Sequence, residues 1–173
     1  MRSLRVPIAT MVFGASLVLM GGTASAVDIS GTISSTLTIT EDSRLVGNVT
    51  CTVTGAPCIA FGASGVTLTL NGFSITGQAD PVTGCGGGGT AGEHGILISG
   101  LRGVVIRGPG IVQRFRNQGI IISGGSSRVL VTQVTASTNC ASGFWVGDGS
   151  SDNELEANIS VRNGSATAAC GGI

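Results

Sequence analysis

The sequence is poor in charged and aromatic residues. Among its 173 residues there is no lysine, no tyrosine, one histidine and one tryptophan, and charged residues make up only 10%. All nine basic residues are arginine, and nine acidic residues balance them. A protein that binds the phosphates of nucleic acid needs a basic stripe of Lys and Arg. The composition therefore predicts no nucleic-acid partner.

Low charge does not indicate disorder in this chain. Disordered chains are poor in Val, Ile and Leu, whereas this sequence is rich in them and in Thr, and they alternate with polar residues. It also contains 30 glycines. β-Branched residues favour strands, while Gly, Ser and Asn favour tight corners. The composition predicts short strands joined by tight turns.

Three short apolar segments recur at a fixed interval. They open with Gly95, Gly119 and Gly143, so the interval is the same both times. In each repeat two further apolar segments follow, and then a polar corner. These corners contain Asn117, Asn139 and Asn163. Three strands and three corners at a constant period are typical of a solenoid. The sequence predicts an all-β solenoid of about five coils of roughly 24 residues each.

Residues 1–26 have the composition of a secretory signal peptide. Arg2 and Arg5 flank the start of an apolar run over residues 6–20, and Ala24-Ser25-Ala26 forms a small-residue cleavage site. That run, of roughly 15 residues, is shorter than the ~20 that span a membrane. We therefore expect secretion, a mature domain over residues 27–173 and no membrane association after cleavage.

Two regions of the mature domain depart from the repeat. Residues 27–57 alternate less regularly, as expected of an N-terminal capping region. Residues 78–94 form a glycine-rich interruption, since the equivalent positions Val66 and Val104 lie much farther apart than one repeat. This predicts a loop that projects from one corner, where function usually lies. Because the chain stops where another first strand would begin, we expect a solenoid that is incomplete at its C-terminus or covered there.

The five cysteines all follow the signal segment, at positions 51, 58, 85, 140 and 170. An oxidising compartment favours pairing. Cys51 and Cys58 would close a small loop. Cys140 and Cys170 would occupy the same corner of successive coils, about 4.8 Å apart, which a disulfide can span. We therefore predict a Cys140–Cys170 bridge, leaving Cys85 as a free thiol or paired beyond residue 173.

Two motifs resemble those of a known family. Residues 70–77 read Leu-Asn-Gly-Phe-Ser-Ile-Thr-Gly, and residues 103–108 read Gly-Val-Val-Ile-Arg-Gly. With the repeated Gly-apolar-apolar-Ile-Ser-Gly units, they resemble the right-handed parallel β-helix proteins of the pectate-lyase-like superfamily over most of residues 58–173. The resemblance implies a right-handed parallel β-helix. Similar proteins include polysaccharide lyases, glycoside hydrolases and adhesins, so it does not imply one activity.

The catalytic patterns of that superfamily are incomplete here. Arg107-Gly108-Pro109 begins the arginine pattern of pectate lyases, but Val112 stands where the second arginine belongs. The paired aspartates of galacturonan hydrolases are absent, and the single histidine lies in Glu93-His94-Gly95. We predict no catalytic residue and no cofactor in this segment.

An acidic cluster is the main candidate for a metal site. It comprises Asp148, Asp152, Glu154 and Glu156. Oxygen ligands in a loop hold Ca²⁺, but this spacing matches neither an EF-hand nor the nonapeptide calcium repeat. We interpret the cluster as a solvated turn and predict no metal.

Arginines on one face are the first candidate ligand-binding residues. Strand alternation that buries Ile111 and Phe115 turns Arg114 and Arg116 outward. The same phase turns Arg162 outward two coils later. Guanidinium groups on one face bind sugar carboxylates or sulfates. The alternative is that these arginines only solvate a strand face.

Trp145 is the other candidate. It follows Phe144 in a first strand, so one ring should point inward and the other outward. An exposed Trp145 would stack on a sugar ring. We therefore predict a secreted module that binds an acidic polysaccharide or a cell-surface glycan. The alternatives are a lyase or hydrolase whose active site lies beyond residue 173, and a structural or adhesin repeat.

Overall fold

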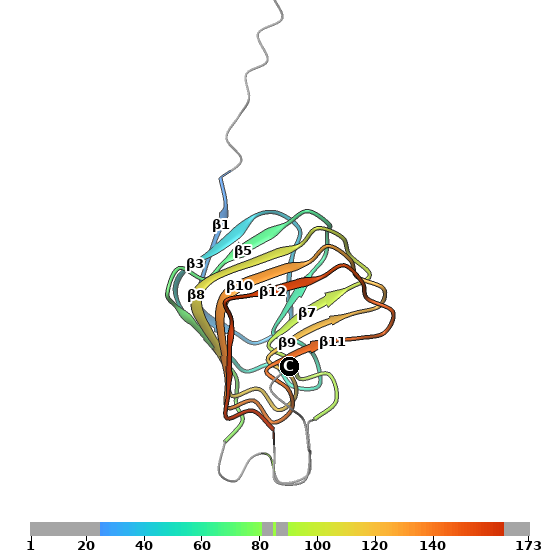
Figure 1. Cartoon of the computed structure of the whole chain (residues 1–173). Helices are drawn as coiled ribbons and strands as arrows, with labels where there is room; N and C mark the ends of the chain where they lie inside the picture. Colours follow the sequence, from blue (N-terminus) through green and yellow to red (C-terminus); the bar gives the residue numbers. More distant parts are fainter. Residues whose placement is uncertain (1–24, 81–84, 86–89, 165–173) are drawn as a thin grey trace, which may run out of the picture.

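The structure is a computed structural model that describes residues 25–80, 85 and 90–164 of the chain. All regular elements in this part are β-strands, thirteen in number (Figure 1). No helix there has the length and apolar character to cross a membrane. The all-β prediction is confirmed.

The recurrent apolar segments form one parallel sheet, sheet B, with the order β11-β9-β7-β4-β2. Ile96 pairs with Ile120 and Ile120 with Phe144, which confirms the constant interval of the repeat. The strands of this sheet are β2 (Leu37–Ile39), β4 (Ile59–Phe61), β7 (Ile96–Ser99), β9 (Ile120–Ser123) and β11 (Phe144–Val146).

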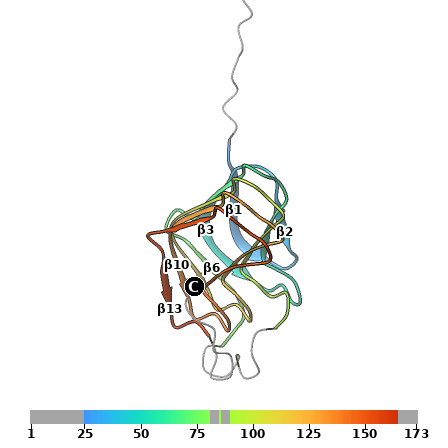
Figure 2. The same cartoon turned by 45° about the vertical axis from the view of Figure 1, so that its right-hand side comes forward.

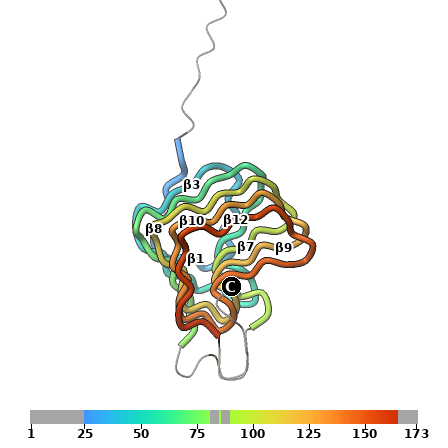
Figure 3. The backbone as a smooth tube through the Cα atoms, viewed as in Figure 1, coloured from blue at the N-terminus to red at the C-terminus, as the bar shows by residue number. Residues whose placement is uncertain are grey.

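The remaining strands form sheet A, with the order β1-β3-β5-β8-β10-β12; β6 pairs with β3 and β8, and β13 with β10. Its strands are β1 (Val27–Ile33), β3 (Ser43–Cys51), β5 (Thr67–Thr69), β6 (Ser74–Thr76), β8 (Val105–Gln113), β10 (Leu130–Ser137), β12 (Glu154–Glu156) and β13 (Ile159–Val161). Every strand pair is parallel. Because the chain alternates between the sheets, it winds into a parallel β-helix with five sheet-B strands, one for each coil (Figure 3).

The core consists of side chains stacked coil upon coil. Ile59, Ile96, Ile120 and Phe144 are paired neighbours, and each is buried. Each such side chain stabilises the fold by about 1.5–3 kcal/mol through burial of apolar surface. Each repeat of the sequence thus supplies one layer of core.

Sheet A bends within each coil (Figure 2). We call the part of each coil before the bend, such as β5 or β12, the first arm of sheet A, and the part after it, such as β6 or β13, the second arm. Asn71, Gln133 and Ala157 lie at this bend with φ of 50°, 58° and 51°. The adjoining Gly72 has φ of 83°.

The predicted burial of Ile111 is wrong, although Phe115 is buried as predicted. Ile111 is 38% exposed, and Val112 is buried instead. Ile111 follows the alternation of β8, which is unbroken from Ile106 to Val112, although β8 contains one residue more than β10 between the pairs Arg107–Thr132 and Gly110–Val134. The phase changes only after β8, since Phe115 is buried three residues after Val112 and Arg114 between them has φ of 59°.

The interruption predicted over residues 78–94 lies between β6 and β7. Ile59 pairs with Ile96, and the sequence between them is much longer than that between the next pair, Ile96 and Ile120. We call residues 78–94 the insertion. Within it the structure describes residues 78–80, 85 and 90–94.

The structure contains two disulfides, one of which corrects the sequence prediction. Cys51 pairs with Cys58, as expected, with 5.9 Å between their Cα atoms. Cys140 pairs with Cys85 at a Cα separation of 5.1 Å, so the predicted Cys140–Cys170 bridge is wrong. The insertion leads back to the corner of Cys140, whereas the prediction compared only successive coils. Cys170 lies outside the described residues.

Candidate functional site

Two of the predicted arginines occupy equivalent positions at one corner. Arg114, Thr138 and Arg162 each follow the second arm of sheet A and have φ of 59°, 53° and 56°. The backbone N–H of Arg114 donates to the Ser137 carbonyl (3.3 Å), and that of Thr138 donates to the Val161 carbonyl (3.2 Å). These three residues therefore stack along the solenoid axis. We call them the corner column.

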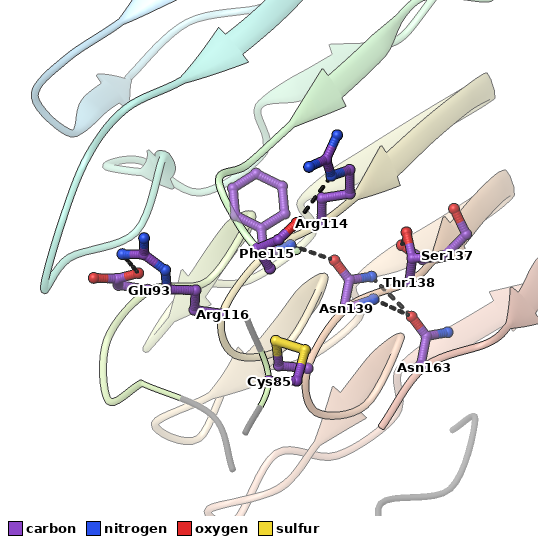
Figure 4. Close-up of a disulfide and its surroundings, with 11 residues drawn as sticks. Cys85, Glu93, Arg114, Phe115, Arg116, Ser137, Thr138, Asn139 and Asn163 are labelled. Carbon is purple, nitrogen blue, oxygen red and sulfur yellow. Dashed lines mark hydrogen bonds and ion pairs between the residues drawn. A yellow bond between two sulfur atoms is a disulfide. The ribbon is translucent and has the colours of Figure 1, made fainter. Parts of the chain in front are cut away.

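Two asparagines, the buried Asn139 and the partly exposed Asn163, fix the backbone of this corner (Figure 4). Asn139 is only 1% exposed; its Oδ1 accepts from the Phe115 N–H (3.0 Å) and its Nδ2 donates to the Val112 carbonyl (3.3 Å). Asn163 Oδ1 accepts from both the backbone N–H and Nδ2 of Asn139, each at 3.0 Å. The predicted third member, Asn117, lies outside this ladder and donates to the Thr90 carbonyl (3.0 Å).

Both arginines of the corner column are exposed. Arg114 Nε donates to the carbonyl of Ala79, at 2.9 Å, which anchors the start of the insertion. A guanidinium has five N–H donors, so four of those of Arg114 lie on its terminal nitrogens. The side chain can thus hold the insertion and still present donors to a ligand.

Thr138, between the two arginines, is a site residue that the sequence analysis missed. Its hydroxyl donates to the carbonyl of Ser137, at 2.7 Å. The sequence does contain a signal for it, because Thr138 lies one repeat after Arg114 and one repeat before Arg162. Its role in the column becomes visible once the corner is aligned coil by coil.

Arg116 does not join the other two arginines. Its Nη1 lies 3.3 Å from Glu93 Oε2, and Glu93 is only 7% exposed. Glu93 Oε1 also accepts from the backbone N–H of Gly55 (2.9 Å), inside the loop closed by Cys51 and Cys58. Arg116 therefore connects three segments, and Glu93 compensates its charge.

A cavity of about 10 Å³ lies beside this ion pair. It is lined in part by His94, whose Nδ1 is buried and has no hydrogen-bond partner in the described part of the chain. Burial lowers the pKa of His94, and the Gln118 side chain partly opposes that shift. The volume suits one water molecule, so this cavity does not accommodate a substrate.

Trp145 points outward and Phe144 inward, as strand alternation predicts. Trp145 pairs with Ile121, and Ile121 pairs with Leu97. These three partly exposed side chains form an apolar stripe on the outer face of sheet B. Trp145 therefore lies on a sheet face, separate from the corner column.

The other surface features are less suited to an acidic ligand. An open groove of about 600 Å³ runs along the bend of sheet A, and no charged residue lines it. The residues of the acidic cluster, Asp148, Asp152, Glu154 and Glu156, are exposed. Across residues 25–80, 85 and 90–164, no three His, Cys, Asp or Glu side chains are grouped to hold a metal ion.

Comparison with known proteins finds no matching family model, no similar curated protein and no similar solved structure.

Proposed function

We propose that this chain is a secreted parallel β-helix module that binds acidic polysaccharide through the corner column. The observation that supports the proposal is the placement of two exposed guanidinium groups, those of Arg114 and Arg162, at equivalent positions of the same corner. Guanidinium groups bind carboxylate and sulfate through paired N–H donors. Linear acidic polysaccharides present such groups at regular intervals.

The geometry of a solenoid favours a linear ligand. Neighbouring parallel strands lie about 4.8 Å apart, so the corner column extends along the axis by about 10 Å. A polysaccharide chain that follows the axis meets one corner residue per coil.

Membership of the pectate-lyase-like superfamily and secretion are part of this proposal. The motifs at residues 70–77 and 103–108 support the first. The Cys51–Cys58 and Cys85–Cys140 disulfides support the second, because disulfides persist in oxidising compartments.

The test is a glycan-binding assay with two matched double variants. Arg114→Ala with Arg162→Ala removes both charges of the corner column. Arg107→Ala with Arg128→Ala removes the same charge from two other exposed arginines. Polyuronates, sulfated glycans and a neutral glucan serve as probes, and circular dichroism verifies the fold of each variant.

We expect the corner-column variant to bind acidic glycan about tenfold more weakly, since two exposed ion pairs contribute up to about 1 kcal/mol each and about 1.4 kcal/mol corresponds to tenfold. The control variant should bind as the unmodified protein does. Equal losses of affinity in both variants would show that binding depends only on the net charge of the protein, which would contradict the proposal. So would the absence of binding to any acidic glycan.

A further inference from the structure

We propose that the corner column selects polysaccharides whose acidic groups lie on alternate sugars, with a neutral sugar between them. This inference rests on the proposed function and specifies its ligand. It concerns the order of groups along the column, in which Arg114 and Arg162 are the cations and Thr138 lies between them.

The first argument is spacing. Consecutive members of the column are one coil apart, about 4.8 Å, which is similar to the length of one sugar unit. Three successive sugars of a chain that follows the axis therefore face Arg114, Thr138 and Arg162 in turn. The first and third sugars meet guanidinium groups, and the second meets a hydroxyl.

The second argument is the orientation of that hydroxyl. The proton of the Thr138 hydroxyl is directed to the Ser137 carbonyl at 2.7 Å. What remains for a ligand is oxygen lone-pair density, which accepts a hydrogen bond. A sugar hydroxyl satisfies it, whereas a carboxylate, which has no proton to give, is repelled.

The third argument is the nature of the neighbouring groups. Ser137 and Gln113, which precede Thr138 and Arg114, are neutral, and Gln113 Nε2 donates to the Thr76 hydroxyl (3.1 Å). Arg116, the nearest arginine in sequence to Arg114, is paired with Glu93. Apart from Arg114 and Arg162, which face the neighbouring sugars, no cation in the described part of this corner is thus positioned to compensate an acidic group opposite Thr138.

The experiment changes the middle position alone. Thr138→Arg converts the column to three cations, and arginine fits there because Arg114 and Arg162 have the same backbone conformation. Gln133→Arg is the control, since Gln133 is exposed, lies in the same coil and has φ of 58°. Thr138→Asn is a second variant that tolerates positive φ and supplies N–H donors.

The probes are hyaluronan oligosaccharides, with a carboxylate on alternate sugars, and oligogalacturonates with the same number of carboxylates, one on every sugar. We expect the unmodified protein and Gln133→Arg to bind the alternating probe at least fivefold more tightly. Thr138→Arg should reverse this preference, and Thr138→Asn should reduce it.

Two results overturn the inference while the proposed function stands. One is tighter binding of oligogalacturonate by the unmodified protein. The other is an equal effect of Thr138→Arg and Gln133→Arg on the ratio of the two affinities. If neither probe nor any sulfated glycan binds, the proposed function fails and the inference fails with it.

Discussion

The residues of the corner column share a backbone conformation that L-amino acids usually avoid. Arg114, Thr138 and Arg162 all have positive φ, which costs about 1–2 kcal/mol per residue outside glycine. The side-chain amides of Asn139 and Asn163 hold the adjoining backbone in place. The direction of each arginine is therefore determined by the backbone of the corner.

His94 should make the stability of the protein depend on pH. Burial lowers the pKa of His94 below its usual value of 6.5, so the unfolded chain takes up a proton first as the pH decreases. The contribution of neutral His94 to the stability of the fold is complete above pH 6.5 and is lost as the pH falls through the pKa of His94 in the folded protein. Each unit of pKa difference corresponds to about 1.4 kcal/mol in the free energy of unfolding. Urea denaturation between about pH 7.5 and about pH 5.5, above the carboxylate range, measures this loss.

The matched variant is His94→Gln, which has no group that titrates in this range. Because His94 is the single histidine of the sequence, we expect the variant to have nearly constant stability over the same interval. A pH dependence that is the same in both proteins would contradict the assignment.

At the scale of elements, asparagine ladders connect the last coils. Asn153, Asn158 and Asn163 are regularly spaced, and each Oδ1 accepts from a backbone N–H one period of 24 residues earlier. Each Nδ2 also donates to a carbonyl 27 residues earlier. The three corners of one coil are therefore bonded to the coil before it.

Replacing Asn139 with alanine should destabilise the corner strongly. The substitution leaves the buried N–H of Phe115 and carbonyl of Val112 without their partner, and an unsatisfied buried group costs about 1–3 kcal/mol. We expect Asn139→Ala to lower the free energy of unfolding by about 2–3 kcal/mol, measured by urea denaturation at neutral pH.

Asn117→Ala is the matched control, because the hydrogen bond of the Asn117 side chain to the Thr90 carbonyl is exposed. The control should lose less than about 1 kcal/mol. Equal losses in the two variants would show that the ladder adds nothing beyond an ordinary hydrogen bond.

The sequence predicted the strands of the solenoid well and their phase less well. The constant period and the insertion are both visible in the sequence, since the same apolar pattern returns or fails to return. The outward position of Ile111 follows the alternation of β8, and the phase changes only at the corner, where Arg114 has positive φ. Alternation counted across that corner, from Phe115 back to Ile111, cannot detect this change of phase.

At the scale of the whole molecule, contacts between distant segments were the least predictable feature. Cys85 and Cys140 are 55 residues apart, and Arg116 finds its partner Glu93 in the insertion. Both contacts depend on where the insertion returns to the stack. The sequence therefore identified Arg114 and Arg162 as candidate ligand-binding residues. It did not predict the ion pair between Arg116 and Glu93, which excludes Arg116 from these candidates.

The stack also explains how a chain with so few charges acquires a local cationic site. Its coils place Arg114 and Arg162 on one corner although two full repeats of the sequence separate them. Thr138 lies between them, so the two positive charges are held about two coil spacings, or about 10 Å, apart. Recognition by this corner should therefore be electrostatic and sensitive to salt.

Calorimetric titration of the folded protein with an acidic oligosaccharide, at about 0.01 M and about 0.15 M salt, tests this claim most directly, because the screening length falls from about 30 Å to about 8 Å. The account predicts that binding weakens as salt is added, and that Arg114→Ala with Arg162→Ala abolishes most of the affinity and of its salt dependence. Equal affinity and equal salt dependence in the unmodified protein and the double variant would contradict it.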